Sequence, residues 1–146
     1  MPRTIESVDV AVTLTDGSYH SVDSSDMAFR AAAKVALGEA LPRARPVLLE
    51  PILAATIYIP SDALARASAL VTARRGQILG FEPRENWAGW EALRAMIPEA
   101  EVGDMIVELR SATAGVGGFE TKFDHYAELV GRPAEIIIAA RQKALG

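Results

Sequence analysis

The sequence predicts an α+β fold, and three observations support this. Segments with apolar residues at every second position alternate with segments whose apolar residues recur every three or four positions, the spacings of strands and helices. Clusters of Gly and Pro separate these segments, as expected for short connections. If residues 90–97 form a strand, the order from residue 46 is strand, helix, strand, strand, helix, strand, and the predicted fold is a ferredoxin-like βαββαβ sandwich with both helices on one face of an antiparallel sheet.

Composition narrows the class of protein. The chain has 146 residues, of which 50% are hydrophobic and 23% are charged, as in ordinary globular proteins. It contains no cysteine, which excludes disulfides and thiolate metal sites. A net charge of -4 argues against indiscriminate binding to phosphates. Because no apolar run is long enough to cross a membrane and no signal-peptide pattern is present, we expect a cytoplasmic protein without a membrane partner.

Residues 1–45 are predicted to form a first, incomplete unit made of a strand, a loop and a helix. The strand is indicated by alternating apolar residues at positions 8, 10, 12 and 14, and Asp16-Gly17 is a turn signal after it. Asp23, Ser24 and Ser25 offer oxygens that can cap a helix expected from Ser25 to Leu41. The prolines of residues 42–46 then break the helix and mark a domain boundary.

Residues 46–146 are predicted to form the second unit. An apolar strand at 52–59 places Leu53, Ala55, Ile57 and Ile59 on one face. A helix capped by Ser61 follows and ends at Arg74 and Arg75, with Gly76 as its C-cap. The remaining predicted elements are a strand at 77–81, a helix at 102–112, a strand at 119–126 and a last helix at 133–144.

Catalytic chemistry is poorly represented in the sequence. No Gly-x-x-x-x-Gly-Lys-[Ser/Thr] phosphate loop is present, and the two histidines lack a nearby metal-binding partner. His20, with carboxylates at positions 16, 23 and 26, could form a general-base cluster. An exposed turn histidine among helix-capping carboxylates is the simpler interpretation. We therefore expect no catalytic residue, no metal site and no cofactor in this chain.

Several motifs resemble the C-terminal part of bacterial elongation factor G. They span nearly the whole chain in the same order: Gly17-Ser-Tyr-His-Ser-Val-Asp-Ser-Ser25, Met27-Ala-Phe29, Pro46-Val-Leu-Leu-Glu-Pro-Ile52, Arg74-Arg-Gly-Gln-Ile78, Leu109-Arg-Ser-Ala-Thr-Ala-Gly115 and Phe123-Asp-His-Tyr126. The resemblance implies that residues 1–45 are the end of a fourth domain, whose fold is like that of ribosomal protein S5 domain 2. Residues 46–146 would be a ferredoxin-like fifth domain with a C-terminal helix.

The same resemblance settles the disputed segment at 90–97. Its residues are good helix formers, so propensity alone predicts a helix there. The family has a strand at this position, and alternation of Glu91, Leu93, Ala95 and Ile97 permits one. We therefore predict a strand.

The resemblance also implies a function, because the family is a multidomain GTPase that moves transfer RNA and messenger RNA through the ribosome. The loop containing Gly17, Ser18, Tyr19 and His20 matches the tip of the fourth domain, which contacts decoding-site RNA and the transfer RNA-messenger RNA duplex. Arg74 and Arg75 could contact large-subunit RNA at the stalk base, although a helix end also favours cations there. GTP and magnesium would bind an upstream domain.

Other hypotheses remain open at this point. Residues 65–72, 87–90 and 116–119 depart from the usual family pattern and suggest an elongation factor G-like paralogue without the main translocase activity. A stand-alone ferredoxin-like module for protein or ligand binding is a second alternative, and a small enzyme using His20 is a third. The edge of the N-terminal strand would be unpaired, which predicts either a homodimer through that strand or a loosely held segment.

Overall fold

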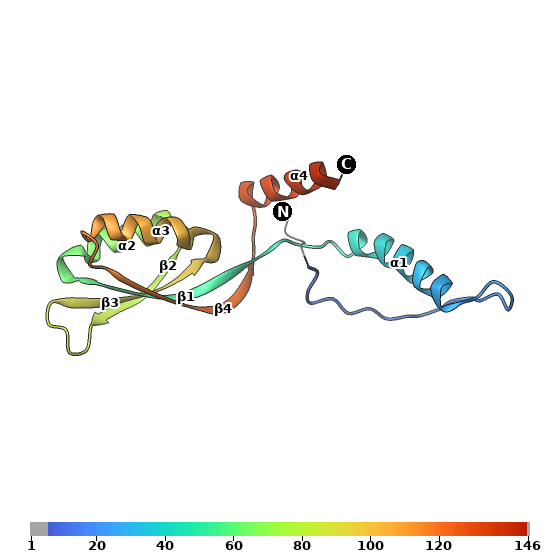
Figure 1. Ribbon diagram of the computed structural model, residues 1–146, viewed down its shortest axis with the longest axis horizontal. Coiled ribbons are helices and arrows are strands. Elements are labelled where there is room, and N and C mark those ends of the chain that lie inside the picture. The colour runs from blue at the N-terminus through green and yellow to red at the C-terminus, as the bar shows by residue number, and fades with distance from the viewer. Residues whose placement is uncertain (1–5, 146) are drawn as a thin grey trace. The chain divides into compact units, whose positions relative to one another are not determined.

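The computed structural model describes residues 6–145 (Figure 1). The chain divides into two compact units, Met1–Pro46 and Val47–Gly146. Their division coincides with the proline-rich break that follows the first predicted helix.

The strand predicted at residues 8–14 is not formed. This segment is extended, but none of the described residues pairs with it. Its apolar side chains are exposed, from 50% for Val8 to 89% for Leu14. Alternating apolar residues produce a strand only where a partner supplies the hydrogen-bonded ladder and a layer covers the apolar face. This unit provides neither among its described residues, so the prediction was wrong.

The helix predicted after the loop is α1 (Asp26–Arg43). Ser25 is its N-cap and its Oγ accepts a hydrogen bond from the N–H of Ala28 at 3.1 Å, as the sequence indicated. The predicted end at Leu41 was early, because the helix continues through Pro42 to Arg43. Proline removes one backbone donor, but the N–H of Ala44 still donates to the carbonyl of Ala40 at 3.1 Å and completes the last turn.

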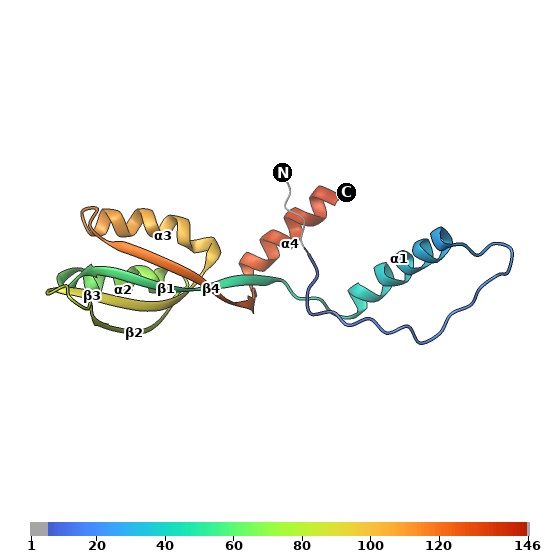
Figure 2. The same cartoon turned by 60° about the horizontal axis from the view of Figure 1, so that its bottom comes forward.

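The second unit contains the remaining helices and strands (Figure 1). In chain order they are β1 (Leu49–Pro60), the 3-10 turn η1 (Ser61–Ala63), α2 (Leu64–Ala73), β2 (Gln77–Pro83), β3 (Trp90–Pro98), α3 (Glu99–Ala112), β4 (Gly118–Glu128) and α4 (Arg132–Leu145). Every pairing in the sheet is antiparallel and the strand order is β2-β3-β1-β4, which is the ferredoxin-like arrangement. Figure 1 shows α2 and α3 together on one side of the sheet, and Figure 2 shows α4 following the end of β4, apart from them.

The core lies between the sheet and the α2–α3 layer. The alternation predicted for β1 is confirmed, because Ala55, Ile57 and Ile59 are all at most 3% exposed. Ala55 pairs with Ala95 at the centre of the sheet, where two small side chains let the helices approach closely. The largest fully buried side chains are Ile57, Ile59, Leu93, Ile97, Met105, Leu109 and Val71. Full burial of such a side chain stabilises the fold by roughly 1.5–3 kcal/mol.

The disputed segment is a strand, so the prediction at residues 90–97 is confirmed. β3 pairs with both β1 and β2, and Leu93, Ala95 and Ile97 are fully buried. Two hydrogen-bonded neighbours and a buried face outweigh the modest helix preference of its residues.

Two local predictions around α2 were wrong. Ser61 does not cap the helix, because its hydroxyl donates to Glu91 Oε1 at 3.2 Å and a 3-10 turn begins at Ser61 instead. Gly76 is not the left-handed residue after α2. Arg75 takes that conformation with φ 58°, and the N–H of Gly76 donates to the carbonyl of Val71 at 2.8 Å.

Candidate functional site

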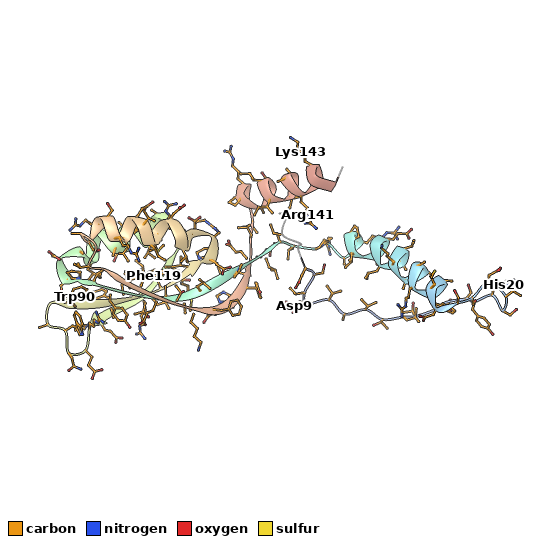
Figure 3. All side chains as sticks on the ribbon, in the orientation of Figure 1. Asp9, His20, Trp90, Phe119, Arg141 and Lys143 are labelled. Carbon is orange, nitrogen blue, oxygen red and sulfur yellow. The ribbon has the colours of Figure 1, made fainter. Side chains whose placement is uncertain are left out.

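The loop before α1 is closed by hydrogen bonds around His20. The N–H of His20 donates to Ser24 Oγ at 2.9 Å, and the N–H of Ser24 donates back to the carbonyl of His20 at 3.0 Å. Asp16 Oδ1 accepts from the N–H of Gly17 at 2.7 Å and stabilises the turn that begins the loop. These bonds hold residues 20–24 in one compact turn that leads into the capped helix. Figure 3 shows His20 at that turn.

The imidazole of His20 is oriented by its own loop. Its Nδ1 lies 3.3 Å from the backbone nitrogen of Val22, which donates to it, and 3.5 Å from Asp23 Oδ2. A ring nitrogen that accepts an N–H is unprotonated, so the neutral ring carries its proton on Nε2. The side chain is 70% exposed. His20 therefore presents a hydrogen-bond donor and an aromatic face to a partner.

Tyr19 adds a second exposed ring to this surface. It is 81% exposed. A shallow, open depression runs beside it, lined by Ser18, Tyr19, His20, Asp23, Ser24, Ala28, Phe29 and Ala32. The hydroxyls of Ser24 and Ser25 already accept backbone hydrogen bonds, and Asp23 is 82% exposed. The arrangement suits contact with a larger partner better than enclosure and activation of a small substrate.

The two predicted arginines lie in the other unit, within a network of carboxylates. Arg75 makes two hydrogen bonds to Glu50, at 2.8 and 3.1 Å, and a third to Glu101 at 3.2 Å. Arg74 pairs with Glu101 at 3.5 Å, with Asp104 at 3.4 Å and with Glu108. The network joins the start of β1 to α3 through the turn after α2.

This network determines what the two arginines can do. The hydrogen bond to Glu108 is the main reason that the pKa of Arg74 is raised, and the bond to Glu50 does the same for the pKa of Arg75. Four carboxylates surround two guanidinium groups, so the cluster is acidic overall. A phosphate could contact either arginine only by competing with these carboxylates.

The sequence did not single out an aromatic cluster at the β2–β3 loop. The guanidinium carbon of Arg84 lies 4.3 Å from the ring centroid of Tyr58, 4.0 Å from that of Trp87 and 5.8 Å from that of Trp90. The two indoles meet edge-on, with centroids 5.3 Å apart. Two tryptophans only three positions apart were the available signal. Their meeting with Tyr58 depends on the pairing of β1 with β3.

The sequence has no phosphate-loop motif, and no group of three His, Asp or Glu in residues 6–145 is placed to hold a metal. Within the same range, no helix is both long and apolar enough to cross a membrane.

Comparison with known proteins gives the family. Residues 4–45 match the family described as elongation factor G, domain IV, and residues 47–137 match elongation factor G C-terminus. An elongation factor G-like protein from Synechocystis sp. is 51% identical over 122 residues, covering 84% of this chain and 18% of that protein. A crystal structure of a protein from Thermus thermophilus is similar with a TM-score of 0.76 and 38% identity, covering 88% of this chain and 19% of that chain.

The chain therefore spans about a fifth of the length of these two relatives. The two matched families are consecutive and divide near residue 46, where the structure also divides. By these matches and by its ferredoxin-like second unit, the chain belongs to the elongation factor G family of translation factors.

Proposed function

We propose that this chain is the ribosome-contacting C-terminal part of a translational GTPase that promotes movement of transfer RNA and messenger RNA during protein synthesis. The observation that carries the proposal is the hydrogen-bonded loop at residues 16–24, which exposes Tyr19 and the Nε2 side of His20. Rings that are exposed and oriented in this way can stack on bases or donate to phosphate and 2′-OH groups. Membership of the family supports a partner made of RNA.

The proposed action is steric. The loop enters the decoding site, contacts the transfer RNA-messenger RNA duplex through Gly17, Ser18, Tyr19 and His20, and opposes backward slippage. GTP hydrolysis with magnesium takes place in a domain outside this chain and supplies the motion. The ferredoxin-like unit contacts large-subunit RNA at the stalk base, where Arg74 or Arg75 exchanges a carboxylate for a phosphate. The protein acts in the cytoplasm.

The tip role is tested by replacing His20 with Ala in the full-length factor. Loss of a hydrogen bond from His20 to a charged phosphate should lower the rate of a step that depends on it by roughly ten-fold. Single-round translocation should therefore slow by about that factor. GTP hydrolysis should be unchanged, because the loop does not bind the nucleotide. His125→Ala is the matched control, since that histidine lies on β4, in the other unit. Translocation as fast as in the unsubstituted factor would refute the tip role.

Two observations support a second candidate function. Residues 65–72, 87–90 and 116–119 depart from the usual family pattern, and the Synechocystis relative is described as elongation factor G-like. In that case the protein is a specialised paralogue that binds the ribosome without the main translocase activity. The unsubstituted factor would then fail to support translocation, while His20→Ala would still weaken ribosome binding.

A further inference from the structure

The β2–β3 loop carries a rigid aromatic surface on the ferredoxin-like unit. The N–H of Arg84 donates to the carbonyl of Trp90 at 2.8 Å, and the N–H of Trp87 donates to the carbonyl of Arg84 at 3.1 Å. Outside the loop, the N–H of Ser61 donates to the carbonyl of Gly89 at 2.9 Å. Figure 3 shows Trp90 beside this loop, at the start of β3. The loop is therefore fixed at both ends and braced against η1.

Arg84 fixes the side chains as well. Its guanidinium contacts the rings of Tyr58 and Trp87 at 4.3 and 4.0 Å, so one face of the Trp87 indole is covered. Trp87 is nevertheless 49% exposed. About half of the surface of Trp87 therefore remains accessible, while Trp90 meets it edge-on with ring centroids 5.3 Å apart. The result is an immobilised aromatic platform.

We propose that this platform, made of Trp87 and its brace Arg84, binds an unpaired nucleobase of RNA by stacking. The cation over the ring draws electron density from the indole, which makes the accessible part of the ring less attractive to a second cation and better suited to a neutral ring. Unpaired bases are such rings, and RNA-binding proteins stack them on aromatic side chains. The inference does not rest on the tip loop, which lies in the other unit.

The groove beside the platform supports a contact dominated by the ring rather than by charge. It is lined by Arg84 and Arg94 and also by Glu82, Glu85 and Glu120. Arg94 has Glu82 at 3.9 Å and is 59% exposed, so it can accompany one phosphate of the stacked nucleotide. The three carboxylates offset the two arginines and keep other phosphates away. Binding should therefore depend only weakly on salt.

Of the two tryptophans of the chain, Trp87 lies in this loop and Trp90 directly follows it, so intrinsic tryptophan fluorescence reports on this region alone. The probe is hexa-adenosine RNA added to the full chain, and the control is an abasic ribose-phosphate hexamer of equal charge. The RNA should quench the fluorescence and the abasic hexamer should not. Equal binding of the two hexamers would show a phosphate contact and overturn the proposal. Quenching by a tyrosine-containing peptide but not by RNA would assign the surface to a protein partner and also overturn it.

Variants locate the contact, with anisotropy of a labelled hexa-adenosine as the readout. Trp87→Ala should weaken binding by about 5- to 150-fold, the range that corresponds to removing one base-stacking ring. Trp87→Phe should retain most of the affinity, and Arg84→Ala should lose part of it by releasing the indole. His20→Ala should leave hexa-adenosine quenching of the loop unchanged, which separates this proposal from the tip-loop function. Unchanged affinity in a folded Trp87→Ala chain would exclude stacking.

Discussion

The C-terminal end of α2 depends on two residues, Arg75 and Gly76, whereas the sequence predicted Gly76 alone as the cap. Arg75 adopts the left-handed conformation, and its guanidinium reaches Glu50 and Glu101. Gly76 is needed for space, because a Cβ there would lie 2.6 Å from Val71 Cγ1 and 2.8 Å from the Val71 carbonyl oxygen. The backbone can donate to that carbonyl only if no side chain intervenes.

Gly76→Ala should therefore destabilise the second unit. Val71 is fully buried and cannot move away, so we expect a loss of about 1–3 kcal/mol in the free energy of unfolding, measured by urea denaturation. Gly103→Ala is the matched control, since a Cβ there meets nothing within 4 Å. That control lies inside α3 and should gain about 0.5–1 kcal/mol. Equal stability of Gly76→Ala and the natural chain would show that the turn can open without loss.

The pair between Glu50 and Arg75 tests the ion network at the level of single residues. Glu50 is only 13% exposed and accepts two hydrogen bonds from the guanidinium, so Glu50→Gln should reduce the free energy of unfolding by about 1–2 kcal/mol. The pKa of Arg75 is higher in the folded chain than in the unfolded chain. The resulting stabilisation is fully present at a pH below the unfolded-state pKa and is lost only as the pH rises through the folded-state pKa. Arginine titration therefore does not limit stability at neutral pH. Glu128→Gln, on exposed β4, is the control and should have little effect when both variants are measured by urea denaturation. A loss no larger than that of the control would contradict the role of the pair.

At the level of elements, the sequence predicted what local chemistry and burial determine together. Strands β1 and β4 and helices α2 and α3 were predictable from periodicity, and Ser25 was predictable as a cap. The strand β3 was not predictable from propensity, because its two neighbours decide its conformation. The segment at residues 8–14 shows the reverse, since a clear period of two produced no strand without a partner.

The candidate sites follow the same logic. His20 and Tyr19 were predictable as exposed loop rings, whereas the contact of Val22 with the imidazole depends on the exact turn. The carboxylates around Arg74 and Arg75 come from β1 and α3, distant in sequence. Pairing of β1 with β3 likewise brings Tyr58 to the loop that carries Arg84. Tertiary pairing, invisible to local patterns, determines these environments.

For the whole molecule, the two units should differ sharply in stability. The helix α1 has no buried residue, and most of the stability of a helix in a protein comes from tertiary packing of its apolar face. A chain of residues 47–146 should therefore melt at the same temperature as the full chain.

In hydrogen exchange, the amides of α1 and of residues 10–14 should exchange rapidly, while those of central β1 and β3 should be protected up to the global free energy of unfolding. Rapid exchange that is independent of protein concentration would identify the loosely held segment. Slow exchange that strengthens with concentration would contradict this expectation and support the homodimer, because a second copy would then provide the ladder that residues 8–14 lack.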